Sequence, residues 1–313
     1  MTVHAEEGIY VDLDELIALQ YKAKGFTFLP RQPIHSILAG RHASRMRGRG
    51  LDFEEIRGYL PGDDPRTIDW KVTARTQEPH VRVYTEERDR PALIVVDQRI
   101  AMFFGSVRAM KSVVAAQVAA LGAWRVFASG DRVGAVVFND QEIRTVKSQR
   151  SRRNVLQILN AVVEMNRALS VDAGIQSNTE MLNRALDSVA RIAKHDYLVT
   201  IISDFDGMDD ETHRLITLMS QHNDMIVVPV FDPLSKRFPE RGRLVVSDGE
   251  LQLELDTEKG SVQQRVIEVG DRRMKSIMRW WEELGVPVAP LTTDRDPVDQ
   301  IQRLLGYAGR GGR

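Results

Sequence analysis

Two aspartates directly follow apolar segments, at positions where a sheet protein can carry out chemistry. Asp97 ends the run LIVVD, Asp204 ends the run YLVTIISD, and Thr179 opens the helical pattern TEMLNRALDSVARI. In an open α/β sheet, ligands gather at the carboxyl ends of the strands. We therefore expect Asp97, Thr179 and Asp204 to form one constellation at that edge. The alternative is that each of them only caps a helix or a turn.

Two residues near Asp97 are unsuited to holding a cation. Mg²⁺ prefers oxygen ligands in near-octahedral geometry, but Ala101 supplies none and Arg99 brings a positive charge. Buried carboxylates without partners are costly, and a guanidinium can bond them in a forked geometry. The sequence therefore predicts a metal-free pseudo-site of Asp97, Arg99, Ala101, Thr179 and Asp204, with Arg99 in the place of a cation. We expect no cofactor, and Mg²⁺ is disfavoured. The alternative is an Arg99 side chain that points into solvent.

The elements that must position these residues alternate between strand and helix from residue 91 onward. The alternation predicts an α/β fold, a mostly parallel sheet with helices on both faces, and the turn NDQE adds one antiparallel edge strand. A second hairpin is expected in RLVVSDGELQLELD. Strands are expected at 92–97, 132–138, 142–146, 197–203, 225–231 and 286–291, and helices near 107–128, 151–166, 178–194, 209–221, 262–284 and 297–306.

The 313 residues are enough for one large domain and a smaller one. Residues 91–306 carry the α/β pattern. Residues 1–90 are polar, rich in arginine and broken by turns, which indicates a small β-rich N-terminal segment with short strands. Residues 307–313 are expected to be a disordered tail.

Composition excludes several classes of function. The absence of cysteine excludes thiol catalysis, disulfides and zinc–thiolate sites, and the net charge of -1 gives no attraction to nucleic acid. The longest helix-like apolar stretch, Val113 to Trp124, is too short to cross a bilayer, and the N-terminus lacks the pattern of a signal peptide. We therefore expect a cytoplasmic protein that neither binds nucleic acid nor inserts into a membrane.

The segment GDDPRTIDW combines turn residues with three aspartates. Three acids could bind a cation, but a structural or docking role explains the segment better. In that interpretation Asp63 and Asp64 help to build a turn, Arg66 pairs with an acid, and Trp70 fills a small core.

Two other segments leave alternatives open. The basic run RTVKSQRSRRN, residues 144–154, lacks the interleaved aromatic residues typical of nucleic-acid binding. We interpret it as a solvated loop, with a docking surface for an acidic partner as the alternative. In the predicted helix 262–284, apolar periodicity favours Trp281 in the core and Trp280 closer to solvent.

The order of Asp97, Thr179 and Asp204 among these elements resembles a von Willebrand factor A domain over residues 91–306. In that family an Asp-x-Ser-x-Ser motif, a threonine and a later aspartate hold one divalent cation. The two serine positions of the motif fall on Arg99 and Ala101 here. The resemblance therefore implies the fold but not an intact metal site.

The segment GRGLDFEEIRGYLPGDDPRTIDWKVTAR, residues 48–75, resembles the signature of the bacterial family catalogued as domain of unknown function number 58. There the signature precedes a von Willebrand A-like domain, as it does here. The resemblance implies an adaptor or assembly factor that works with an AAA+ ATPase of the MoxR type. Candidate contacts with such a partner are the charged residues Arg47, Arg49, Asp63, Asp64 and Arg66.

Two functions remain after this comparison of motifs. The first is a non-enzymatic protein-interaction adaptor, which accounts for the lack of a nucleophile and base at recognisable spacing. The second is a metal-assisted hydrolase that uses Asp97, Asp204 and Asp206. We favour the adaptor because the hydrolase needs a cation at a place where the sequence puts a guanidinium.

Overall fold

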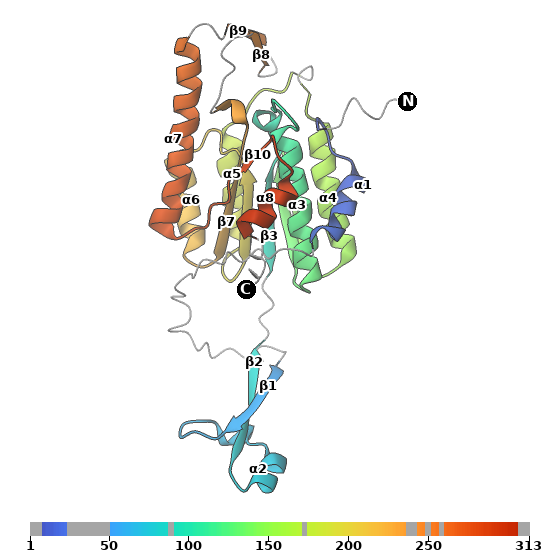
Figure 1. Cartoon of the computed structure of the whole chain (residues 1–313), viewed down its shortest axis with the longest axis vertical. Coiled ribbons are helices and arrows are strands. Elements are labelled where there is room, and N and C mark those ends of the chain that lie inside the picture. Colours follow the sequence, from blue (N-terminus) through green and yellow to red (C-terminus); the bar gives the residue numbers. More distant parts are fainter. Residues whose placement is uncertain are drawn as a thin grey trace, which may run out of the picture. The chain divides into compact units, whose positions relative to one another are not determined.

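The computed structural model describes residues 8–23, 51–86, 91–170, 174–235, 243–247, 252–256 and 260–305 (Figure 1). The chain divides into two units: residues 1–31 with 90–313, which we call the sheet unit, and residues 32–89, which we call the hairpin unit. The described residues 8–23, expected to be part of the N-terminal segment, belong instead to the sheet unit. Arg47, Arg49 and the tail 307–313 lie outside the described residues.

Among the described residues, the sheet unit is built on a six-stranded sheet with the order β10-β7-β6-β3-β4-β5. Neighbouring strands are parallel, except that β4 and β5 are antiparallel. The predicted α/β class and its antiparallel edge strand are thus confirmed. The strands are β3 (Ala92–Asp97), β4 (Val133–Phe138), β5 (Ile143–Gln149), β6 (Leu198–Ser203), β7 (Asp224–Phe231) and β10 (Leu291–Thr292).

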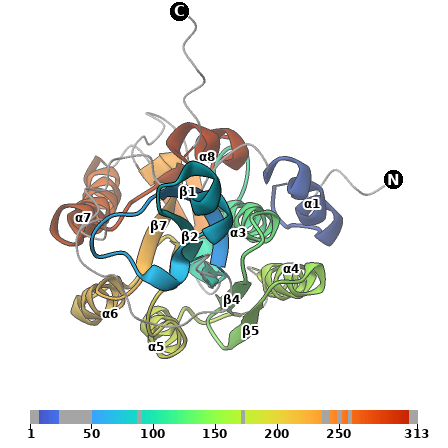
Figure 2. The same cartoon turned by 90° about the horizontal axis from the view of Figure 1, so that it is seen from below.

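Helices cover both faces of this sheet (Figure 2). In β3, Ile94 and Val96 join one core and Leu93 and Val95 join the other, because successive strand residues point to opposite faces. The first core is closed by α1 (Leu13–Ala18), α3 (Lys111–Ala128), α4 (Arg152–Arg167) and α8 (Pro297–Leu305), and the second by α5 (Glu180–Ile192), α6 (Asp210–Ser220) and α7 (Gly260–Leu284).

The α1 segment packs against α3 and α4 and forms buried hydrogen bonds with them. Leu16 is fully buried, and its carbonyl oxygen accepts a hydrogen bond of 3.0 Å from Trp124 Nε1. The backbone N–H of Val11 donates to Asn166 Oδ1 at 2.9 Å. These contacts explain why this part of the N-terminal region belongs to the sheet unit. The 3₁₀ turn η1 (Leu19–Tyr21) follows α1.

Short elements complete the sheet unit. The predicted second hairpin is present as the antiparallel pair β8 (Arg243–Ser247) and β9 (Gln252–Asp256). The 3₁₀ turns η5 (Ile100–Met102) and η7 (Pro233–Ser235) follow β3 and β7. In the described part of the chain, no helix combines the length and the apolarity that a bilayer crossing requires.

The hairpin unit contains the antiparallel strands β1 (Leu51–Gly58) and β2 (His80–Glu86), with the 3₁₀ turn η4 (Pro65–Thr67) and the helix α2 (Trp70–Thr76) between them. Two aspartates that are paired with arginines stabilise the connection between β1 and β2. Asp63 forms a forked pair with Arg57, and Asp69 caps α2 while it pairs with Arg82 at 2.8 Å.

Two expectations for this segment were wrong. Arg57 and Arg82, rather than Arg66, supply the partners of Asp63 and Asp69. Trp70, the first residue of α2, is 71% exposed and therefore fills no core within the hairpin unit. The sequence therefore predicted the turn, but it did not predict whether the side chain of Trp70 is buried or exposed.

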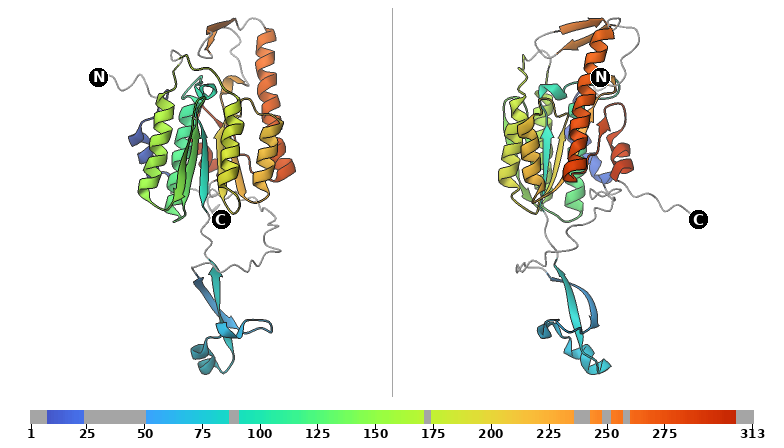
Figure 3. Two further views of the ribbon diagram at one scale, coloured as in Figure 1. Left: turned by 180° about the vertical axis from the view of Figure 1, so that it is seen from behind. Right: turned by 90° about the vertical axis from the view of Figure 1, so that its left-hand side faces the viewer.

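Helix α7 buries Trp280, whereas the sequence predicted that Trp281 would be in the core. Trp280 is fully buried and meets Phe205 edge to face, with ring centroids 5.3 Å apart, whereas Trp281 is only half-buried. Apolar residues on this helix define two overlapping faces. The position of α7 beside α6 (Figure 3) selects the face that contains Ile277 and Trp280.

Replacing these tryptophans tests the packing of α7. Trp280→Ala should lower the free energy of unfolding by about 3–5 kcal/mol, since it deletes a fully buried aromatic side chain. Trp281→Ala is the matched control and should cost less than about 1.5 kcal/mol. Urea unfolding followed by circular dichroism measures both. Equal losses in the two variants would contradict this assignment of the buried face.

Candidate functional site

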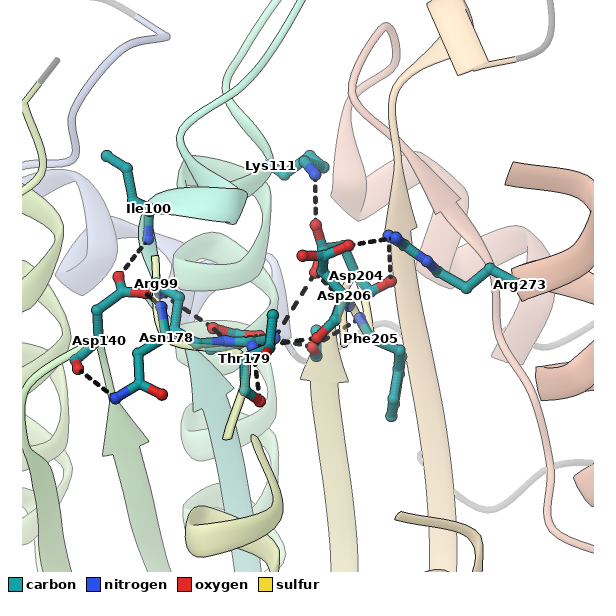
Figure 4. Close-up of polar contacts among 12 residues, drawn as sticks. Arg99, Ile100, Lys111, Asp140, Asn178, Thr179, Asp204, Phe205, Asp206 and Arg273 are labelled. Atoms are coloured by element: carbon teal, nitrogen blue, oxygen red, sulfur yellow. Dashed lines mark hydrogen bonds and ion pairs between the residues drawn. The ribbon is translucent and has the colours of Figure 1, made fainter. Parts of the chain in front are cut away.

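The carboxyl ends of β3 and β6 meet at one edge of the sheet. Val96 of β3 pairs with Ile202 of β6 in a parallel register, so Asp97 at the end of β3 and Asp204 just after β6 lie at the carboxyl ends of neighbouring strands. Thr179 enters the same place from the start of α5 (Figure 4). The structure thus brings together the three residues that the sequence placed in one constellation.

Arg99 lies against Asp97 and is itself buried. The Arg99 side chain is 1% exposed and Asp97 0%. Nε of Arg99 donates to both carboxylate oxygens, at 3.0 and 3.1 Å, and Nη2 donates to Oδ2 at 2.7 Å. Ser203 Oγ also donates to Oδ2, at 2.6 Å. Both oxygens of Asp97 are therefore already occupied by protein donors.

The same guanidinium ties two other segments to this edge. Nη1 of Arg99 donates to the carbonyl oxygen of Asp206 at 3.1 Å and, more weakly, to that of Thr179 at 3.5 Å. Its carbon Cζ lies 5.6 Å from the centre of the Phe138 ring. Burial alone would lower the pKa of Arg99, but the charge and hydrogen bonds of Asp97, together with Asp204 and Asp206, outweigh it and raise the pKa.

Asp204 has a different principal partner. Lys111 Nζ lies 2.5 Å from Asp204 Oδ2, whereas Arg99 Nη2 is 3.9 Å from Oδ1. Arg273 of α7 donates to the backbone oxygen of Asp204 at 3.3 Å and pairs with the carboxylate of Asp206. Three acids and three bases thus alternate in one cluster, which we call the Asp97 cluster: Asp97, Arg99, Lys111, Asp204, Asp206 and Arg273.

Lys111 and Arg273 were missed by the sequence analysis. Lys111 is the first residue of α3, where the helix macrodipole disfavours a cation, but the predicted helix began near residue 107 and so hid this placement. Arg273 lies in the middle of α7 with no local feature that marks it. Its role follows only from the packing of α7 against the loop after β6.

The loop that carries Asp204 and Asp206 is held in a specific conformation. Phe205 has a positive φ of 56° and is fully buried against α7. Gly207 has φ 77°, and a Cβ at that position would lie 2.4 Å from Cβ of Thr179. Glycine is therefore required where the loop passes the start of α5.

Asp140 joins a further loop to the cluster. One of its carboxylate oxygens accepts from the backbone N–H of Ile100 at 2.6 Å and the other from that of Asn178 at 2.8 Å. Burial raises the pKa of Asp140, although these hydrogen bonds and Arg99 oppose the shift. Asp140 thus fixes the chain after Arg99 to the chain before Thr179.

The residues at this edge do not fit a divalent cation. The oxygens of Asp97 are bonded to Arg99 and Ser203, the side chain of Ala101 has no ligand atom, and the guanidinium of Arg99 lies between Asp97 and Asp204. Among the described residues, no three histidine, aspartate or glutamate side chains are arranged to hold a metal ion. The chemistry that this arrangement supports is the mutual neutralisation of buried charges.

The partner-binding candidates lie elsewhere, in the hairpin unit. Asp63 is engaged by Arg57, and Asp64 caps η4 by accepting from the backbone N–H of Arg66 at 2.9 Å. The two aspartates therefore shape the turn. The structure describes Asp63, Asp64 and Arg66 but not Arg47 and Arg49.

Removing Arg99 tests whether it replaces a cation. Arg99→Ala leaves the buried carboxylate of Asp97 without a charged partner and should lower the free energy of unfolding by about 3–5 kcal/mol. The exposed Arg279→Ala is the control, with an expected change within about 0.5 kcal/mol. In the double variant Arg99→Ser with Ala101→Ser, we expect the melting temperature to rise with Mg²⁺, unlike that of the unmodified chain. Two results would disprove the idea that Arg99 replaces a cation. One is Mg²⁺ binding to the unmodified chain, measured by calorimetry, that Asp97→Asn abolishes. The other is an Arg99→Ala variant whose melting temperature is unchanged.

The pH dependence of stability tests the Lys111–Asp204 pair. Burial would raise the pKa of Asp204, but the charges of Lys111, Arg273 and Arg99 and the Lys111 hydrogen bond lower it to about 2. A pKa lowered on folding stabilises the chain above the unfolded value of about 3.9, here by about 2–3 kcal/mol, and this is lost as pH falls through the folded value. Lys111→Met should therefore destabilise most at neutral pH and progressively less toward about pH 2.

Urea unfolding of this variant at several pH values measures the effect. Lys194→Met, which removes an exposed cation, is the control and should show no such trend. A deficit in Lys111→Met that stays constant from neutral to acid pH would rule out the ionised pair as its source.

Comparison with known proteins identifies the family. Two mycobacterial relatives, uncharacterized proteins Rv1480 of Mycobacterium tuberculosis and Mb1516 of Mycobacterium bovis, are each 28% identical over 285 residues, which is 90% of this chain and 87% of theirs. Among solved structures, the conserved hypothetical protein BatB of Bacteroides thetaiotaomicron aligns over 69% of this chain and 98% of its own, with 12% identity and a TM-score of 0.40. The SpRpn10 VWA domain aligns over 69% and 95%, with 12% identity and a TM-score of 0.34. The model of DUF58, a protein family of unknown function, matches residues 55–274, and this chain belongs to that family.

Proposed function

We propose that this chain is a non-enzymatic adaptor or assembly factor that binds other proteins, with an AAA+ ATPase of the MoxR type as one partner. The observation that carries the proposal is the Asp97 cluster. Its three acids and three bases neutralise one another and hold the loops at the carboxyl edge of the sheet. Carboxylates that could otherwise bind a cation or activate water therefore serve to stabilise the fold.

A hydrolase that uses Asp97, Asp204 and Asp206 is less well supported. Such an enzyme needs carboxylates free to bind a cation or to activate water. Here Asp97 is bonded by Arg99 and Ser203, Asp204 by Lys111, and Asp206 pairs with Arg273. The contacts therefore favour a scaffold over a reaction centre.

The hairpin unit offers a surface suited to a protein partner. Trp70 is 71% exposed, Leu60 60% and Ile56 37%, so their own unit leaves these apolar side chains uncovered. Exposed tryptophans are frequent anchors of protein interfaces. The charged turn residues Asp63, Asp64 and Arg66 lie in the same unit and would tune association rate more than affinity. The assignment of a MoxR-type ATPase as the partner rests on the resemblance of residues 48–75 to the family signature.

Co-purification with the MoxR-type ATPase of the same organism tests the proposal. We expect a complex at micromolar concentrations, and Leu60→Ser with Trp70→Ser should weaken it by about tenfold or more because the two changes remove apolar contact area. The matched control is Tyr21→Ser, since Tyr21 is equally exposed at 74% but belongs to the sheet unit.

Two results would overturn this function. The first is the absence of a complex at micromolar concentrations with and without nucleotide, which would exclude the ATPase as the partner. The second is a Mg²⁺-dependent hydrolytic activity that Asp204→Ala abolishes while the fold is retained, which would replace the adaptor with an enzyme.

A further inference from the structure

A strongly basic surface lies at the opposite end of the sheet from the Asp97 cluster. β4 runs parallel to β3, so the residues just before Val133 lie at the amino edge, away from Asp97. Segments 125–132 and 147–153 contain six cations and one acid, although the whole chain has a net charge of -1. We call these six residues the basic surface: Arg125, Arg132, Lys147, Arg150, Arg152 and Arg153.

The fold brings the two segments together. Val133 of β4 pairs with Gln149 of β5, the edge strand that lies beside α4 in Figure 2. Asn154, which is buried in the first turn of α4, donates from Nδ2 to the backbone oxygens of Val133 at 2.6 Å and of Lys147 at 3.1 Å. The basic surface is therefore a product of tertiary structure as well as of local sequence.

Most of these cations are not neutralised by the chain itself. Lys147, Arg150, Arg152 and Arg153 are exposed and form no ion pair with any other described residue. By contrast, Arg144 on the same strand pairs with both Glu142 and Glu164. Carboxylates from before β5 and from α4 thus neutralise Arg144 near the start of this strand, whereas the described part of the chain supplies none for these four residues.

Two of the cations are positioned by contacts other than carboxylates. The guanidinium of Arg152 lies over the Trp124 ring, 5.6 Å from its centre. Arg150 lies over Gly130, where an added Cβ would be 2.5 Å from Nη2, and Gly130 has φ 84°. Because Gly130 has no side chain, the turn between α3 and β4 leaves space for the guanidinium of Arg150.

The start of α4 adds to the positive potential. Arg152 and Arg153 are the first two residues of this 16-residue helix, and its first turn contains no acid. Cations at a helix N-terminus are destabilised by the positive end of the macrodipole. An external anion at the same place would be stabilised by the macrodipole and by the cations. Placement of arginines at these two positions is thus unfavourable for the isolated chain and favourable for a complex with an anion.

We propose that the basic surface docks an acidic segment of a partner protein. Complementary charge across an interface steers association and selects partners. Single-stranded nucleic acid would require exposed aromatic rings for stacking, but Trp124 is 3% exposed and lies beneath Arg152. This docking is separate from the ATPase contact proposed for the hairpin unit, and each can fail without the other.

Fluorescence anisotropy with the full chain tests the surface. The probe is a labelled peptide of alternating glutamate and glycine, with an otherwise identical glutamine peptide as the uncharged reference. Lys147→Glu with Arg153→Glu should weaken binding of the glutamate peptide by about tenfold or more. Lys194→Glu with Arg279→Glu, which reverses two exposed cations outside the surface, should weaken it by less than about twofold.

Three outcomes would overturn the proposal. The first is that the glutamate peptide does not bind at low ionic strength. The second is that the two double variants weaken binding of the glutamate peptide equally. The third is that a thymidine oligonucleotide of the same charge binds more tightly than the glutamate peptide, and that Lys147→Glu with Arg153→Glu abolishes this binding. The last outcome would assign the surface to nucleic acid. Circular dichroism of both double variants verifies that each is folded.

Discussion

The buried pair of Arg99 and Asp97 is the interaction on which the carboxyl edge of this sheet depends. Both side chains are almost completely inaccessible to water, so neither charge can be left without the other. The same guanidinium also bonds the carbonyl oxygens of Thr179 and Asp206. One residue therefore compensates a buried carboxylate and fixes the loops before α5 and after β6.

The remaining charges extend this arrangement without adding net charge. Lys111 brings the start of α3 to Asp204, and Arg273 brings α7 to Asp206. Because Phe205 between these two aspartates packs on Trp280, the polar cluster and the second hydrophobic core hold the same loop. Protein side chains thus supply the positive charge beside Asp97, Asp204 and Asp206.

The two ends of the sheet consequently differ in what they offer a partner. At the carboxyl edge, acids and bases pair with one another and are largely withdrawn from solvent. At the amino edge, Lys147, Arg150, Arg152 and Arg153 remain exposed without a described carboxylate partner. The basic surface and the hairpin unit therefore expose more unpaired charged or apolar side chains than the Asp97 cluster does.

Sequence alone determined the sheet and the meeting of its acids. Strands 92–97 and 197–203 were predicted within one residue of β3 and β6, because strands buried on both faces read as continuous apolar runs. Parallel strands end at one edge, which placed Asp97 near Asp204. Only the tertiary structure decided which cations reach them, since the approach of Lys111 and Arg273 depends on how α3 and α7 pack. It also decided the burial of tryptophans, because helical periodicity allows neighbouring faces and only the packed partner selects between them.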